Sequence, residues 1–166
     1  TFLGDGLFLI LPALILLFFS LRHFVFLLTA YLSTGLITQI LKRVFFEDII
    51  RPSKYFHDLS PLHLVDGIKM LSGRSFPSGH STSAFALFLC LALIASNRYL
   101  KMVCFIMACS VAFSRVYLSQ HFLIDIFAGS IIGSIGAIAF YQLFYHEERN
   151  WHAWSVQKLI KHDQTA

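Results

Sequence analysis

Apolar residues dominate five stretches of the chain, and short polar breaks or one long polar segment separate them. The apolar runs cover about residues 7–20, 24–41, 81–96, 99–113 and 122–145. A membrane-spanning helix needs about 20 mostly apolar residues, so the shorter runs require flanking residues to span. The pattern predicts an all-α integral membrane bundle of five transmembrane helices. It forms a single domain over residues 1–166, with a loop at about 44–77 and a tail from about 146.

Individual residues indicate where the helices end. Pro77 followed by Ser78 predicts that the third helix begins near Ser78, because serine is a favoured N-cap. We expect this helix to end at residues 97–98, the fourth to end around residue 113, and the fifth to begin near His121. The first run follows no basic segment and no cleavage signature, so a signal peptide is not expected. Within the long loop, Asp66-Gly67 suggests a small hairpin.

Small residues recur in the fifth run at Gly129, Gly133 and Gly136. Such spacing is typical of helices that pack closely within a membrane. The three cysteines, Cys90, Cys104 and Cys109, all fall inside apolar runs. An odd number of cysteines in lipid does not indicate a disulfide framework, so we assign them to packing.

Composition supports a membrane protein. Of the 166 residues, 57% are hydrophobic and only 13% are charged, and 18 are phenylalanine. A soluble domain of this size cannot hide so much apolar surface. The formal net charge of +4 is modest. Because the cations are not gathered on one soluble face, nucleic acid is not an expected partner, whereas the bilayer is.

Counting helix ends divides the polar residues between two sides of the membrane. The long loop and the break around residues 114–121 fall on one side, and the breaks near Arg22 and Arg98 and the tail fall on the other. Both sides carry cations, so the positive-inside rule does not orient the chain by itself. If the loop-side cations serve a site, the remaining cations set the topology. The tail is then cytoplasmic and the site extracytoplasmic, as in a bacterial inner membrane protein.

The loop side also collects the residues able to do chemistry, and they come from four predicted helix ends. His121 and Asp125 are four residues apart, which on a helix places them on one face. A carboxylate beside an imidazole fixes its tautomer and leaves the other ring nitrogen able to attack an electrophile. The alternative is a buried structural pair, but ionisable groups at membrane depth are costly and suggest function.

Three cations, Lys42, Arg51 and Arg115, are predicted to converge on the same place. Arginine binds phosphate oxygens bidentately, lysine binds them as a point charge, and both stabilise the charge of a phosphoryl transition state. A single cation there would more simply extend toward lipid headgroups. Three cations near a His–Asp pair favour a phosphate site.

The segment Ser78-Gly79-His80 supplies the remaining groups. Backbone N–H groups of Ser78 and Gly79 at a helix N-terminus are a natural cradle for phosphate. His80, in the first turn, is placed to protonate a leaving-group oxygen. His80, His121 and Asp125 are also an acceptable set of zinc ligands. Three neighbouring cations would repel a divalent ion, which disfavours the zinc alternative.

These residues resemble the motifs of the type 2 phosphatidic acid phosphatases, which are membrane lipid phosphate phosphatases. The family pattern P-S-G-H occurs intact at residues 77–80, and S-R-x5-H-x3-D occurs intact at residues 114–125. The sequence matches the first family motif, K-x6-R-P, only in part. Arg51-Pro52 is present, but Val44 stands where the family has lysine. We assign the lysine role to Lys42, which has eight residues rather than six between it and Arg51, with Arg43 as the alternative.

The resemblance implies a metal-independent hydrolase without cofactors, in which each motif residue has a role. His121 would form a phosphohistidine, Asp125 would orient His121, and His80 would protonate the leaving lipid oxygen. The phosphate-binding residues would be Lys42, Arg51, Arg115, Ser78 and Gly79. Family members usually have six helices, so a first helix is expected to be missing or cut short here.

The substrate implied is a lipid carrying a phosphate monoester or diphosphate. Polyprenyl diphosphate, phosphatidylglycerol phosphate, phosphatidate and a lipid A phosphate all fit, and the sequence leaves the choice and the oligomeric state open. The alternative class is a non-catalytic binder or transporter of lipid phosphates, which would keep the cations without needing His80, His121 and Asp125.

Overall fold

The computed structural model describes residues 6–56 and 73–146, and the regular secondary structure in these ranges is entirely helical. In chain order the elements are η2 (Gly6–Leu9), α1 (Ile10–Phe19), α2 (Leu21–Ile40), η3 (Leu41–Phe45), α3 (Pro52–Tyr55), α4 (Gly79–Ile94), α5 (Arg98–Tyr117) and α6 (Leu123–Tyr145). The η3 segment is a π-helical turn that continues α2. The predicted all-α class is confirmed, while the predicted hairpin at residues 66–67 lies outside the described ranges.

Helix length separates the five main helices into two groups. Three stretches of the described chain are long and apolar enough to cross a membrane: Leu21–Phe45, Arg98–Tyr117 and Leu123–Tyr145. The apolar helices α1 and α4 are shorter. The 16 residues of α4 extend about 24 Å, slightly less than the ~30 Å of a hydrocarbon core. The chain is an integral membrane protein, and its five spans stay a prediction.

Local capping explains which predicted helix ends were right. Ser78 has an extended backbone and its hydroxyl accepts from the Ser81 N–H at 3.4 Å, so the predicted N-cap of α4 is confirmed. The polar residues at 97–98 do not end this helix, because α4 already ends at Ile94. Asn97 instead caps α5, and its Oδ1 accepts from the Tyr99 N–H at 2.8 Å.

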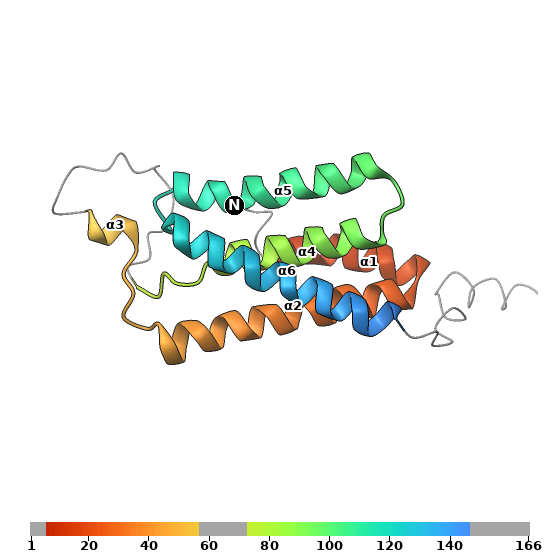
Figure 1. The fold of residues 1–166 in the computed structure, drawn as a ribbon, viewed down its shortest axis with the longest axis horizontal. Helices are drawn as coiled ribbons and strands as arrows, with labels where there is room; N and C mark the ends of the chain where they lie inside the picture. The colour runs from red at the N-terminus through yellow and green to blue at the C-terminus, as the bar shows by residue number, and fades with distance from the viewer. Residues whose placement is uncertain (1–5, 57–72, 147–166) are drawn as a thin grey trace, which may run out of the picture.

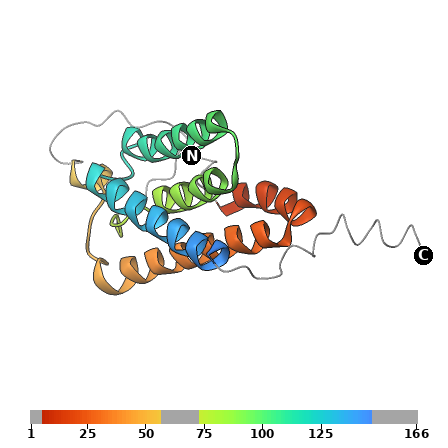
Figure 2. The same cartoon turned by 45° about the vertical axis from the view of Figure 1, so that its right-hand side comes forward.

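Helix α4 lies in the middle of the bundle. Figure 1 shows α5 on one side of it, α2 on the other and α6 crossing in front, and Figure 2 keeps this arrangement after a 45° turn. Helix α4 packs against α2, α5 and α6, whereas α5 and α6 have few contacts with each other. The ends of α2 and α5 and the beginnings of α4 and α6 lie together at the end of the bundle near α3 (Figure 1).

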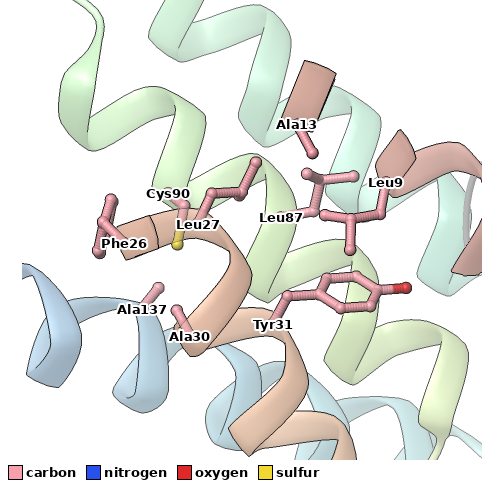
Figure 3. Packing of buried hydrophobic residues seen from close by; sticks show 9 residues of the cluster. All are labelled: Leu9, Ala13, Phe26, Leu27, Ala30, Tyr31, Leu87, Cys90 and Ala137. Carbon is pink, nitrogen blue, oxygen red and sulfur yellow. The ribbon is translucent and has the colours of Figure 1, made fainter. Parts of the chain in front are cut away.

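The apolar core occupies the opposite half of the bundle, where α1 joins α2, α4 and α6. Phe26, Leu27 and Ala30 of α2 are completely buried there against Leu87 of α4 and Ala137 of α6 (Figure 3). A second buried cluster joins α4 to α5. Large apolar side chains also cover the outer surfaces of the helices, as lipid exposure requires. The bundle therefore has a packed interior at one end and polar chemistry at the other.

Glycines allow α6 to approach its neighbours closely. A Cβ added at Gly129 would lie 2.5 Å from the Ser78 carbonyl oxygen, and one added at Gly133 would lie 2.4 Å from the Thr82 carbonyl oxygen. At Gly136 the added atom would lie 2.1 Å from the Thr34 side chain. The predicted packing role of these glycines is confirmed.

Gly133→Ala is expected to destabilise the protein, because its methyl group would overlap the backbone of α4 and force two helices apart. Overpacking of this kind costs about 1–3 kcal/mol. The measurement is the melting temperature in one detergent. The matched control is Gly35→Ala in α2, where an added Cβ meets no atom within 4 Å and helix propensity improves. Equal melting temperatures for both variants would contradict the close α4–α6 contact.

Candidate active site

The turn between α5 and α6 brings His121 back toward the end of α5. Ser119 has a φ of 53°, in the left-handed region, and follows the last residues of the helix. Its N–H donates to the Val116 carbonyl at 2.9 Å, and the Gln120 N–H donates to the Arg115 carbonyl at 3.0 Å. This pair of bonds is a Schellman motif, which reverses the chain at a helix C-terminus. The His121 N–H then reaches the same Arg115 carbonyl at 3.3 Å.

His121 and Asp125 form a pair, although they do not share a helix as expected. His121 precedes α6, which begins at Leu123, and Asp125 is in its first turn. The His121 Nδ1 lies 3.3 Å from Asp125 Oδ2, and the same oxygen accepts from the Phe122 N–H at 2.9 Å. The carboxylate therefore caps the helix it belongs to, and it meets the imidazole because the chain turns immediately before that helix.

Both members of this pair are almost completely buried, with 2% of His121 and 1% of Asp125 exposed. Burial has the largest effect on His121 and lowers its pKa to about 4. The charges of Arg51 and Lys42 lower this pKa further, while the hydrogen bond to Asp125 acts in the opposite direction. His121 is therefore neutral at physiological pH, and one ring nitrogen keeps a lone pair.

Arg51 faces the other side of the imidazole. Its Nη1 lies 3.4 Å from His121 Nε2, and the same nitrogen donates to the backbone and side-chain oxygens of Gln120 at 3.0 and 3.1 Å. Its Nε donates to the Gly73 carbonyl at 3.1 Å. Burial and, next, the charge of Arg115 lower the pKa of Arg51. An anion held by this guanidinium would be within reach of Nε2.

Lys42 reaches the site from the π-helical turn at the end of α2. It is 8% exposed, whereas Arg43 and Val44 on the same turn are exposed. Lys42 is close enough to Arg51, Arg115 and Asp125 to interact with them electrostatically. A π-helical turn accommodates an extra residue and redirects the side chains around it. This geometry favours Lys42 over Arg43 for the first-motif cation.

Arg115 lies in the last turn of α5, and 7% of it is exposed. Its backbone carbonyl accepts from the N–H groups of Gln120 and His121, so its position is fixed relative to His121. It interacts electrostatically with Lys42 and Arg51, and these two in turn act on the His121 imidazole, so the three buried cations form one cluster beside it. Like charges repel at this depth, so the cluster is suited to an anionic ligand.

The segment before α4 contacts the beginning of α6. The Ser78 N–H donates to the Asp125 carbonyl at 2.9 Å. That N–H is therefore already hydrogen-bonded within the protein and does not point to a bound phosphate as expected. Gly79 and His80 follow in the first turn of α4 and are half-buried, and a Cβ added at Gly79 would meet nothing within 4 Å. Gly79 is the first residue of α4, so its N–H has no acceptor within that helix and is the remaining candidate amide.

Two polar residues of the site were missed by sequence reasoning. Ser75 is fully buried, and its hydroxyl donates to Asp125 Oδ2. Gln120, which is 1% exposed, accepts from Arg51. The sequence signalled them only by their position next to motif residues. Ser75 lies just before the P-S-G-H segment, and Gln120 lies just before His121.

The zinc alternative has no support in the part of the chain that the structure describes. There, no three His, Cys, Asp or Glu side chains gather as metal ligands do. His80, His121 and Asp125 thus come from neighbouring helix ends without forming such a group.

Comparison with known proteins identifies the family. The sequence profile described as "PAP2 superfamily" matches residues 23–149, most of the chain, so this protein belongs to that superfamily. A lipid A 4'-phosphatase of Bacteroides thetaiotaomicron is 30% identical over 92 residues, which are 55% of this chain and 41% of the relative. Lipid phosphate phosphatase 1 of Arabidopsis thaliana is 30% identical over 169 residues, 86% of this chain and 51% of the relative. The chain spans about half the length of these curated relatives.

Solved structures agree with this assignment. The crystal structure of Aquifex aeolicus LpxE has a TM-score of 0.70 at 26% identity, and the match covers 85% of this chain and 80% of that one. The PAP2-type phosphatidylglycerolphosphate phosphatase of Bacillus subtilis also has a TM-score of 0.70, at 25% identity, covering 89% and 74%. Both share the fold of this chain, and the second is described as a transmembrane protein of the PAP2 type.

The lowered pKa of His121 predicts that its ring does not titrate between pH 5 and 8. Below about pH 6.5 His121 is protonated in the unfolded chain, whereas in the folded chain it stays neutral until about pH 4. The free energy of unfolding therefore falls as the pH drops from about 6.5 toward 4. The measurement is an NMR titration of histidine-labelled protein in detergent, with His121→Asn assigning the signal. A His121 signal that titrates near pH 6.5 would show that the imidazole is solvated rather than buried among cations.

Proposed function

We propose that the protein is a membrane phosphatase that hydrolyses a phosphate monoester or diphosphate of a lipid through a phosphohistidine intermediate. The observation that carries this proposal is the setting of the His121 ring. Its Nδ1 faces Asp125 at 3.3 Å, and its Nε2 faces a guanidinium nitrogen of Arg51 at 3.4 Å. A neutral imidazole so oriented has its reactive lone pair where an anion would be bound.

The chemistry follows in two steps. In the first, Nε2 forms a bond to phosphorus while the bond from phosphorus to the lipid oxygen breaks, and His80 gives that oxygen a proton. In the second, the neutral His80 takes a proton from water, the water oxygen attacks phosphorus, and the bond to Nε2 breaks. Phosphate leaves and both imidazoles return to their starting states. Asp125 keeps the Nδ1 proton in place throughout.

The three cations would stabilise the negative charge of the transferring phosphoryl group. Lys42, Arg51 and Arg115 are 8%, 5% and 7% exposed, so little water screens their charges. Negative charge on the three equatorial oxygens of the transferring group would be stabilised by them, with the Gly79 amide as a further donor. Ser78 would instead connect α4 to α6. This assignment needs no metal ion for the reaction.

Two apolar hollows along α6 support a lipid substrate. The first, of about 640 Å³, is lined by residues of α4, α5 and α6 that include Phe85, Phe113, Leu123 and Ile124. The second, of about 500 Å³, also has Phe85 in its lining and includes Ile138. Together the two linings extend from Leu123 to Ile138, about 22 Å along α6, roughly the length of a long acyl or prenyl chain. Leu123 is two residues after His121.

The relatives narrow the substrate class without selecting one lipid. Two are named for lipid A 4'-phosphate hydrolysis and one solved structure for phosphatidylglycerol phosphate hydrolysis. For this chain we retain lipid A phosphate, phosphatidylglycerol phosphate, phosphatidate and polyprenyl diphosphate as substrates. We place the site on the extracytoplasmic side of a bacterial inner membrane, with the segment after α6 in the cytoplasm, for the charge argument given above.

The deciding experiment is phosphate release from these four lipids by detergent-solubilised protein in EDTA. We expect turnover by the wild type, a base-stable and acid-labile phosphorylated intermediate, and a loss of about 10³-fold or more in His121→Asn. Glycerol 3-phosphate, which has no acyl chain to occupy the apolar hollows, should react at least about tenfold more slowly than phosphatidate. Lipid binding without phosphate release by the wild type would indicate a binder or transporter, and activity retained in His121→Asn would exclude this nucleophile.

Lys42→Met and Arg43→Met separate the two assignments of the first-motif cation. Loss of one group that stabilises transition-state charge typically costs about 10²- to 10³-fold in kcat. We expect that loss for Lys42→Met and at most a twofold change for the exposed Arg43→Met. The measurement is kcat in detergent with melting temperatures recorded for both variants. The opposite ranking would assign the role to Arg43.

A further inference from the structure

Ser75 makes a contact on the face of the His–Asp pair opposite Arg51. Its hydroxyl donates to Asp125 Oδ2, and its Oγ lies 3.4 Å from His121 Nδ1. The side chain is fully buried, and the Ser75 N–H is anchored to the Ile49 carbonyl at 2.9 Å. Ser75 therefore touches both members of the pair from a backbone position that is itself fixed.

The direction of these bonds follows from counting protons. A serine hydroxyl has one proton to donate and two lone pairs to accept with. Its proton goes to the carboxylate, so toward His121 the Ser75 oxygen can only accept. The Nδ1 position thus faces two acceptors, Asp125 Oδ2 at 3.3 Å and Ser75 Oγ at 3.4 Å. Both acceptors favour a proton on Nδ1, which leaves Nε2 unprotonated and able to attack.

We propose that Ser75 is a positioning residue that selects the Nδ1–H tautomer of His121 and holds Asp125 in place. This inference rests on the proposed function, because it assigns the attacking nitrogen of the same site. Ser75 touches neither phosphate nor leaving group in this role. It acts through the pair, by adding a second acceptor at Nδ1 and by restraining rotation of the carboxylate.

The position of Ser75 also connects the loop to the nucleophile. It lies three residues before Ser78, whose amide donates to the Asp125 carbonyl at 2.9 Å. Ser75 and Ser78 therefore bind Asp125 at its side chain and at its backbone, respectively. The carboxylate is held between the segment before α4 and the first turn of α6, so its direction does not depend on α6 alone.

Ser75→Ala tests the proposal through the ring nitrogens of His121. In ¹⁵N-histidine-labelled protein at pH 7, the wild-type signal should show Nε2 as the unprotonated nitrogen. The alanine variant should show a substantial population protonated at Nε2. We expect kcat for lipid phosphate to fall about 10- to 100-fold in this variant, with KM within about twofold, because phosphate binding is unchanged.

Ser81→Ala is the matched control. Ser81 is equally buried at the beginning of α4, but its hydroxyl donates to the Ser78 side chain at 3.0 Å. It should keep the wild-type tautomer and kcat. Ser75→Cys, which restores a weaker donor and acceptor of similar size, should recover part of kcat. Melting temperatures identify any variant that fails to fold.

The outcomes separate this inference from the function on which it rests. A wild type that releases no phosphate would defeat the proposed function, while the tautomer signals would still report whether Ser75 acts on His121. A wild type that is active, together with a Ser75→Ala variant of unchanged tautomer and kcat, would overturn the role of Ser75 alone.

Discussion

The hydrogen bond from the Ser78 amide to the Asp125 carbonyl joins the beginnings of α4 and α6, and the site depends on it. The bond forms because Gly129 and Gly133 allow the two helices to approach more closely than any larger residue would. At that separation Asp125 lies beside the P-S-G-H segment and beside the turn that carries His121. The contact that packs α4 against α6 therefore also sets the geometry of the catalytic residues.

Burial gives the site its electrostatic character. His121, Asp125 and the three cations lie at a helix-end junction with little exposed surface, where charges are weakly screened. Burial and the nearby cations keep the imidazole neutral, and the carboxylate compensates only in part. A cluster with an excess of positive charge attracts an anion, and the ring retains the lone pair that a nucleophile needs.

The first motif illustrates what sequence comparison alone leaves open. Val44 stands at the family position for lysine, and Lys42 precedes it by two residues. The π-helical turn at the end of α2 buries Lys42 and exposes Val44. Spacing along the chain assumes regular geometry between two points, and a local change in helical winding alters which residue faces inward. The departure in spacing and the departure in structure occur at the same turn.

Hydrophobic periodicity and motif chemistry were enough to predict five helices, the Ser78 cap, the packing glycines and the gathering of two histidines, an aspartate and three cations at one end. Those features depend on residue type and local sequence, which a chain displays directly. Other features appeared only in the folded structure. These are the contacts of Ser75 and Gln120, the hydrogen bond of the Ser78 amide and the position of His121 before α6. Each is a contact between segments distant in sequence or a product of an irregular turn. Which hydroxyl or amide fills the space beside a given side chain is decided by packing in three dimensions.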